Sequence, residues 1–304
     1  MKKLVERLNY NKVITLKLIV PSNGCNARCR FCYMKSYGKN STCLDKQLFL
    51  DNFIISMTTL LDKINGRNPV SLDITGNEPT LDISLFRTIL EKLKSSNLKS
   101  RFCRVTLTTN AVNMKHLIDA CSNFVDYVNI SIHSFDIAER LDIMKYSLTD
   151  NEYSFLTRAL NEHGITVSAI AVIDKPRKDF DGWRNKFIEW CKSNGFIALR
   201  FRCDVFSKNT DYFDEYMLKT MSNKQFSVLV HEKTTDSHWC RLRMNDRFRV
   251  FFLHGVLDTS KVNRGIEYVI HTDGKCYCDF YKQIPIETVD FEIGKIYDII
   301  ETRT

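Results

Sequence analysis

Residues Val13 to Cys32 read VITLKLIVPSNGCNARCRFC and hold the most specific pattern in the chain. Its first part, Val13–Val20, is apolar enough for a buried strand. Three cysteines follow at the spacing C-x3-C-x2-C, namely Cys25, Cys29 and Cys32. Three thiolates this close together can bind one face of a cubic iron–sulfur cluster and leave the fourth iron without a protein ligand. An iron with an open site can bind and activate a small molecule, as open zinc sites do.

The same cysteines allow a second interpretation, which is a zinc knuckle or a set of buried free thiols. A zinc site needs a fourth Cys or His nearby. The next cysteine downstream, Cys43, breaks the compact spacing. The spacing therefore favours the cluster.

The composition is that of a globular protein kept in a reducing compartment. The 304 residues suit one large domain or a core with a smaller extension, and no apolar run is long enough to span a bilayer. Eleven cysteines without a secretory signal indicate the cytoplasm and free or metal-bound thiols. The net charge of +8 favours acidic partners such as nucleotides, nucleic acid or an acidic peptide.

Strand-like and helix-like segments alternate over the first two hundred residues, which predicts an α/β fold with a parallel sheet and helical crossovers. The expected strands are 13–20, 70–74, 104–109, 127–132, 166–173 and 197–205. Six βα units fit an open partial barrel, (βα)6, better than a closed eight-fold barrel. We expect this core over residues 1–206 and a small α+β extension over 207–304. The extension is expected to hold a helix over 211–230, a hairpin over 239–252 and a strand over 268–280.

A second motif, Thr75-Gly76-Asn77-Glu78-Pro79-Thr80, follows the expected strand 70–74. Ligands gather at the carboxyl ends of parallel strands, so this motif and the cysteine loop belong at one edge. Together they resemble the radical S-adenosylmethionine (radical SAM) superfamily, including the aromatic Phe31 just before the last cysteine. The family's glycine–glutamate–proline motif usually has two glycines. Here Asn77 replaces the second, and Asn tolerates unusual backbone angles.

The resemblance covers residues 13 to about 205 and implies a radical SAM enzyme. It implies one [4Fe–4S] cluster on the three cysteines, with S-adenosylmethionine as cofactor and a one-electron donor such as flavodoxin or ferredoxin. The implied reaction is reductive cleavage of S-adenosylmethionine to a 5′-deoxyadenosyl radical, which abstracts hydrogen from a substrate. Cofactor contacts are implied for Phe31, Gly76, Asn77, Glu78, Asn110, Ser131, Ser134 and Val172. His133 follows the same strand as Ser131, and a lone histidine there is more often structural than a proton donor.

Three further cysteines, Cys240, Cys276 and Cys278, lie in a segment that weakly resembles the Twitch and SPASM extensions of radical SAM enzymes. That resemblance implies an auxiliary iron–sulfur cluster. The departures are that no C-x2-C pair is present and that only three ligands are available. The alternative is a degenerate extension whose cysteines pack as small apolar side chains.

Three features of the sequence bear on the substrate. The SPASM-like tail suggests a peptide or protein. Arg241, Arg243, Arg247 and Arg249 alternate with apolar residues, which predicts a strand pair with one charged face and suggests a nucleotide or nucleic acid. Ser134-Phe135-Asp136 is similar to a stretch of the radical SAM nucleotide dehydratases related to viperin.

The competing class of protein is non-catalytic. It is a cysteine-rich zinc or iron–sulfur protein that binds nucleic acid or acts as a sensor.

Overall fold

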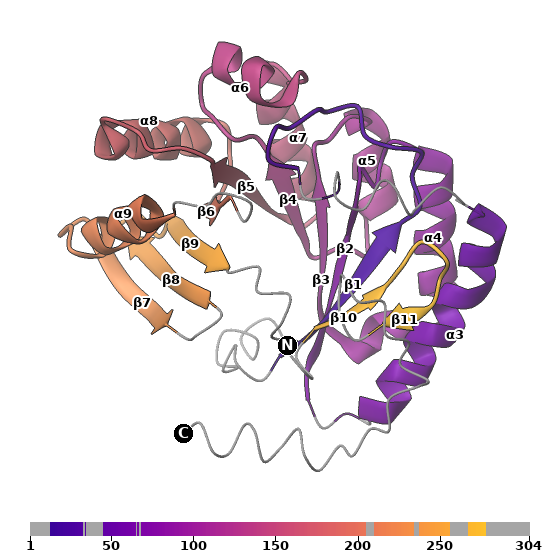
Figure 1. The fold of residues 1–304 in the computed structure, drawn as a ribbon. Helices are drawn as coiled ribbons and strands as arrows, with labels where there is room; N and C mark the ends of the chain where they lie inside the picture. Colours follow the sequence, from indigo (N-terminus) through magenta and orange to yellow (C-terminus); the bar gives the residue numbers. More distant parts are fainter. Residues whose placement is uncertain are drawn as a thin grey trace. The chain divides into compact units, whose positions relative to one another are not determined.

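The computed structural model describes residues 13–32, 34, 45–64, 66, 68–204, 210–233, 237–255 and 267–277 (Figure 1). The chain divides into two compact units. The first unit comprises residues 1–23, 41–106 and 259–304, and the second unit comprises residues 24–40 and 107–258. Both combine parallel strands with helices, so the fold is α/β as the sequence predicts. In neither unit do the described strands close into a barrel.

The first unit is built around the strand that precedes the cysteines. β1 (Ile14–Val20) pairs in parallel with β2 (Val70–Gly76) and with β10 (Glu267–Ile270), and β11 (Cys276–Tyr277) is antiparallel to β10. Its helices are α3 (Lys46–Ile64), α4 (Ile83–Ser95) and the short 3-10 helix η2 (Leu98–Arg101). The apolar stripe of α3 is buried, because residues at three- and four-residue steps share one helix face. β3 (Phe102–Thr109) is divided between the two units after Thr106.

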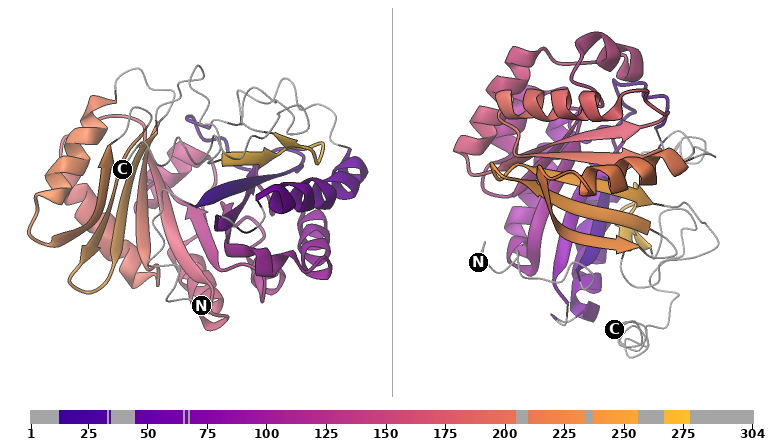
Figure 2. Two further views of the ribbon diagram at one scale, coloured as in Figure 1. Left: turned by 90° about the horizontal axis from the view of Figure 1, so that it is seen from below. Right: turned by 90° about the vertical axis from the view of Figure 1, so that its left-hand side faces the viewer.

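In the second unit, β4 (Tyr127–Ser131), β5 (Thr166–Ile173), β6 (Ala198–Cys203) and β9 (Arg249–Gly255) are parallel neighbours in that order. β8 (Ser237–Met244) is antiparallel to β9, and β7 (Phe226–Lys233) is antiparallel to β8. The helices are α5 (Met114–Cys121), α6 (Ile137–Met144), α7 (Asp150–Glu162), α8 (Phe180–Ser193) and α9 (Asp211–Met221). α9 lies along one face of β7–β9 (Figure 2).

Two expectations for the C-terminal segment are wrong in detail. The helix expected over 211–230 ends at Met221, and Phe226–Lys233 is a strand because its backbone pairs with β8. The strand expected over 268–280 is interrupted after Ile270 by a turn in which Gly274 has a φ of 76°. A side chain at Gly274 would meet the backbone of α3, with the carbonyl oxygen of Phe49 2.7 Å from its Cβ. Glycine is therefore needed there.

Residues after 206 contribute to both units, since α9 and β7–β9 belong to the second and β10 and β11 to the first. The predicted boundary between residues 206 and 207 stays a proposal. β9 extends the parallel series beyond the six strands that the sequence indicates. None of the described helices is long and apolar enough to cross a membrane.

Candidate functional site

The three cysteines of the C-x3-C-x2-C motif lie in one loop of the second unit. None of the three forms a disulfide within the described part of the chain, and each is partly exposed. The backbone N–H of Cys32 donates to the carbonyl of Cys29 at 3.2 Å, and the N–H of Ala27 donates to the sulfur of Cys25 at 3.4 Å. Among the described residues, no three His, Cys, Asp or Glu side chains are grouped so that they could hold a metal ion. Each thiolate of a cubic cluster binds a different iron, so its ligands need not converge on one point.

Asn110 directly contacts this loop. It lies just beyond β3 and is buried. Its Nδ2 donates to Oδ1 of Asn26 at 2.7 Å and approaches Sγ of Cys25 at 3.5 Å, while its Oδ1 accepts from the N–H of Val112 at 3.1 Å. The sequence singled out Asn110 as a cofactor contact, and the structure places its amide on the first cysteine. An N–H directed at a thiolate stabilises the negative charge on the sulfur.

Phe31 fixes the other end of the loop. It forms a small apolar cluster with Ile143 and Met144 of α6, against which Ala27, Cys29 and Val172 pack. The N–H of Arg28 donates to the carbonyl of Met144 at 2.7 Å. Phe31 and Val172, both predicted as cofactor contacts, are therefore brought together with Cys29.

His133 packs against the ring of Phe31. The two rings are 4.7 Å apart edge to face. The Nδ1 atom of His133 accepts the N–H of Val172 at 3.0 Å, and the residue has a φ of 68°. Burial lowers the pKa of His133 to about 3, an effect that Arg202 reinforces and Asp174 opposes. This histidine is a neutral structural side chain, as the sequence favours.

The other two predicted residues on this strand end differ in their surroundings. Ser131 is the last residue of β4, is half-buried and pairs with Ile170 of β5. Ser134 is buried, donates its hydroxyl proton to the carboxylate of Glu139 and accepts the N–H of Asp136 at 3.1 Å. The hydroxyl of Ser134 thus stabilises the turn into α6, and its contact with a cofactor stays a prediction.

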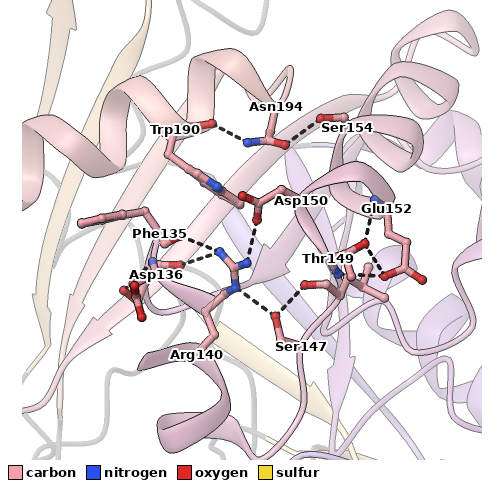
Figure 3. Close-up of polar contacts among 12 residues, drawn as sticks. Phe135, Asp136, Arg140, Ser147, Thr149, Asp150, Glu152, Ser154, Trp190 and Asn194 are labelled. Atoms are coloured by element: carbon pink, nitrogen blue, oxygen red, sulfur yellow. Dashed lines mark hydrogen bonds and ion pairs between the residues drawn. The ribbon is translucent and has the colours of Figure 1, made fainter. Parts of the chain in front are cut away.

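Arg140 anchors that turn and was not singled out from the sequence (Figure 3). Its side chain is fully buried. The Nη1 atom donates to the carbonyl of Phe135 at 2.8 Å, and Nε donates to the hydroxyl of Ser147 at 2.9 Å. The Nη2 atom donates to the carboxylate of Asp150 at 2.7 Å. The guanidinium also lies 5.0 Å from the ring centre of Trp190. Because α6 carries Ile143 and Met144, Arg140 indirectly positions the helix that packs on Phe31. A buried arginine is rarely visible in a sequence, since most arginines are exposed.

In the first unit, the Gly76-Asn77-Glu78 motif lies where β2 ends. Gly76 has a φ of 141°, and a Cβ there would lie 3.1 Å from the carbonyl oxygen of Val20. Asn77 does not have a positive φ, so the unusual backbone angle falls on the retained glycine and not on the substituted one. Glu78 is buried, and its Oε1 accepts the N–H and the hydroxyl of Thr80 at 3.0 and 2.6 Å. A buried carboxylate at a strand end suits a cationic amino group.

The predicted auxiliary cluster gains no support from the described residues. Cys240 lies in β8 of the second unit, and burial raises the pKa of its thiol to about 12. A ligand must be a thiolate, which apolar burial disfavours. Cys276 lies in β11 of the first unit, and Cys278 lies outside the described residues.

Comparison with known proteins places these features in a family. A family model described as the radical SAM superfamily matches residues 19–183. The chain is 21% identical over 299 residues to an S-adenosylmethionine-dependent nucleotide dehydratase from Flammeovirga pacifica, in an alignment that covers 95% of this chain and 96% of that one.

Solved structures show the same fold. SuiB from Streptococcus suis bound to S-adenosylmethionine matches with a TM-score of 0.57 at 16% identity, over 97% of this chain and 70% of that chain. SuiB bound to its precursor peptide SuiA matches with a TM-score of 0.55 at 14% identity, over 95% and 66% of the two chains. Because the family model spans more than half of the sequence, the chain belongs to the radical SAM superfamily and is an enzyme of that class.

Proposed function

We propose that this enzyme cleaves S-adenosylmethionine reductively at a [4Fe–4S] cluster to a 5′-deoxyadenosyl radical, which abstracts hydrogen from a nucleotide substrate. The observation that carries the proposal is the loop of three partly exposed cysteines, none of them in a disulfide among the described residues, with the Asn110 amide on the first of them. Three thiolates and a hydrogen-bond donor to sulfur fit a site-differentiated cluster. When bound, the cluster and S-adenosylmethionine supply the electron transfer and the bond cleavage.

The chain's own residues have supporting roles. Cys25, Cys29 and Cys32 would hold the cluster, and Glu78 with the turn at Gly76 and Asn77 would hold the methionyl amino group. Phe31, Ser131, Ser134 and Val172 remain proposed contacts of the nucleoside part. A flavodoxin or ferredoxin would supply the electron, and a reducing compartment such as the cytoplasm would keep the thiols available.

A nucleotide is favoured as substrate because the curated relative named a nucleotide dehydratase aligns over nearly the whole of both chains. A peptide is the second candidate, since one of the similar SuiB structures holds a bound precursor peptide. A nucleotide or an acidic peptide would each be accommodated by the net charge of +8.

The test is anaerobic reconstitution followed by reduction with dithionite in the presence of S-adenosylmethionine. We expect brown protein with about four irons per chain that releases 5′-deoxyadenosine. Cys29→Ala should lose both the iron and the product, whereas Cys121→Ala, a buried cysteine of α5, should keep both. Colourless protein with stoichiometric zinc, or a cluster indifferent to S-adenosylmethionine, would establish the non-catalytic nucleic-acid-binding alternative instead.

A further inference from the structure

Five arginines occupy one face of the strands β6, β9 and β8 in the second unit. The members of this arginine face are Arg200, Arg202, Arg241, Arg243 and Arg249. Register pairs place Arg200, Phe251 and Arg241 in one row across the three strands, and Arg249 beside Arg243 in another. Paired residues of neighbouring strands point to the same side of a sheet, so these side chains share a face.

The opposite face of the same strands is apolar and covered by helices. Its residues are fully buried, and they are Leu199, Phe201, Cys240, Leu242, Val250 and Phe252. Phe180 of α8 lies 5.8 Å from Phe201 and 6.2 Å from Phe252, and Phe213 of α9 lies 5.8 Å from Phe252, all between ring centres. The arginines therefore face away from α8 and α9. The alternation expected from the sequence for Arg241, Arg243 and Arg249 is confirmed, whereas Arg247 lies in the turn between β8 and β9.

The arginine face has little negative charge of its own. Arg202, Arg243 and Arg249 form no ion pair with any carboxylate in the part of the chain that the structure describes. Glu232 of β7 shares the row of Arg202, and its Oε2 accepts the indole N–H of Trp239 at 3.1 Å. Arg243 and Arg249 are register partners, and two such guanidinium groups without a carboxylate partner repel each other unless an anion lies between them.

Aromatic rings accompany these charges. The guanidinium carbon of Arg200 lies 4.2 Å from the ring centre of Phe251. Trp239 occupies the next row, between Leu253 and Glu232. Arginine and aromatic side chains together bind phosphates by bidentate hydrogen bonds and planar rings by stacking.

One end of the arginine face adjoins the cysteine loop. Arg202 is the register partner of Val172 in β5. Val172 packs with Cys29 against the cluster of Phe31, Ile143 and Met144. The cysteine loop and the arginines therefore lie on the same side of these strands.

We propose that the arginine face binds the phosphate groups of a nucleoside polyphosphate, whose sugar then lies toward the cysteine loop. This inference rests on the proposed function and names the binding site for its substrate. Three strands carry the five guanidinium groups, and strands lie about 4.8 Å apart. A row of guanidinium groups that spans three strands fits a chain of several phosphates better than a single phosphate.

The test is equilibrium binding to the full-length reconstituted enzyme by isothermal titration calorimetry. The probes are ATP, CTP, GTP, UTP and inorganic tripolyphosphate, each at low and high salt. Arg243→Gln and Arg249→Gln should each weaken binding of the preferred triphosphate about tenfold, since each removes a charge-assisted hydrogen bond to phosphate. Arg247→Gln is the matched control, because it removes the same charge from the turn, and its affinity should stay within about twofold of the parent.

The two proposals fail in different ways. If 5′-deoxyadenosine forms but Arg243→Gln and Arg249→Gln bind like Arg247→Gln, the phosphate site is overturned and the radical chemistry stands. If triphosphates bind as expected but no 5′-deoxyadenosine ever forms, the function fails and the phosphate site stands. Binding of a single-stranded oligonucleotide or an acidic peptide, with no binding of any mononucleotide, overturns the phosphate site. Unchanged iron content and thermal midpoint in each variant exclude misfolding.

Discussion

Asn110 and His133 are single side chains with separable effects on the cysteine loop. Asn110 contacts the first cysteine through its amide, whereas His133 supports Phe31 through its ring. The first contact is electrostatic and should change the reduction potential of a bound cluster. The second is packing around a neutral, buried imidazole and should change stability with pH.

Replacing Asn110 by Ala should make the reduction potential of the reconstituted cluster more negative. Loss of an N–H donor to Cys25 removes stabilisation of the more negatively charged, reduced state. A hydrogen bond of this kind is worth about 0.5–1.5 kcal/mol, which corresponds to roughly 20–60 mV for one electron. The measurement is a spectroscopic redox titration. Asn161→Ala, on the exposed end of α7, is the control, and equal potentials for the two variants would contradict the role of Asn110.

His133 should make the protein less stable in acid. Its pKa of about 3 in the folded state lies below the value of 6.5 for an unfolded chain, so the unfolded state binds the proton first as pH falls. The contribution is complete above pH 6.5 and is lost progressively between 6.5 and 3. From about pH 7 to about pH 5 it amounts to about 2 kcal/mol. Denaturant unfolding of wild type and His133→Asn at both pH values measures it, and an identical pH dependence in the two proteins would refute it.

At the scale of elements, α6 determines how the cysteine loop is held, and Arg140 determines how α6 begins. The helix starts at Ile137, and the side chain of the preceding Asp136 accepts the N–H of Glu139 at 2.8 Å. Arg140 then binds the carbonyl of Phe135 and the carboxylate of Asp150, which joins the start of α6 to the start of α7 (Figure 3).

Arg140→Met should lower the free energy of unfolding by roughly 2–4 kcal/mol, because buried carbonyl and hydroxyl groups lose their donor. Asp150→Asn should cost about 1 kcal/mol or less, since Asp150 is 56% exposed and its partner keeps the other contacts. Chemical denaturation of both variants gives the comparison. If Asp150→Asn proved as damaging as Arg140→Met, the ion pair and not the carbonyl contacts would dominate.

The elements also explain which predictions from sequence succeed. β5 has the predicted bounds, since a continuous apolar run reports burial directly. Residues 226–230 are read wrongly as helix because Phe226 and Val230 are four residues apart, a spacing that fits either structure. Pairing with β8, which no local pattern reveals, makes them part of the strand Phe226–Lys233. The cysteines and Asn110 are singled out by motif and strand-end position, and their roles stay predictions. Arg140 is missed because its burial depends on two residues that no local pattern connects with it. Trp190 is distant in the sequence, and Asp150 is a polar residue that does not indicate burial.

At the scale of the whole molecule, the number of clusters follows from where the cysteines lie. Cys240 is buried on the apolar side of β8, where burial raises the pKa of its thiol. We therefore expect Cys240→Ala to keep the same iron content as wild type, about four per chain, with an unchanged electron-spin resonance spectrum.

Removing the three cysteine ligands of the radical cluster leaves only the iron that an auxiliary cluster would hold. The variant Cys25→Ala/Cys29→Ala/Cys32→Ala should bind almost no iron after reconstitution, because the buried thiol of Cys240 resists ionisation. If this variant instead retains about four irons, and if adding Cys240→Ala then removes them, an auxiliary cluster exists and Cys240 is one of its ligands. Cys191→Ala is the matched control, since burial likewise raises the pKa of that thiol and its loss should leave the iron content unchanged in every background.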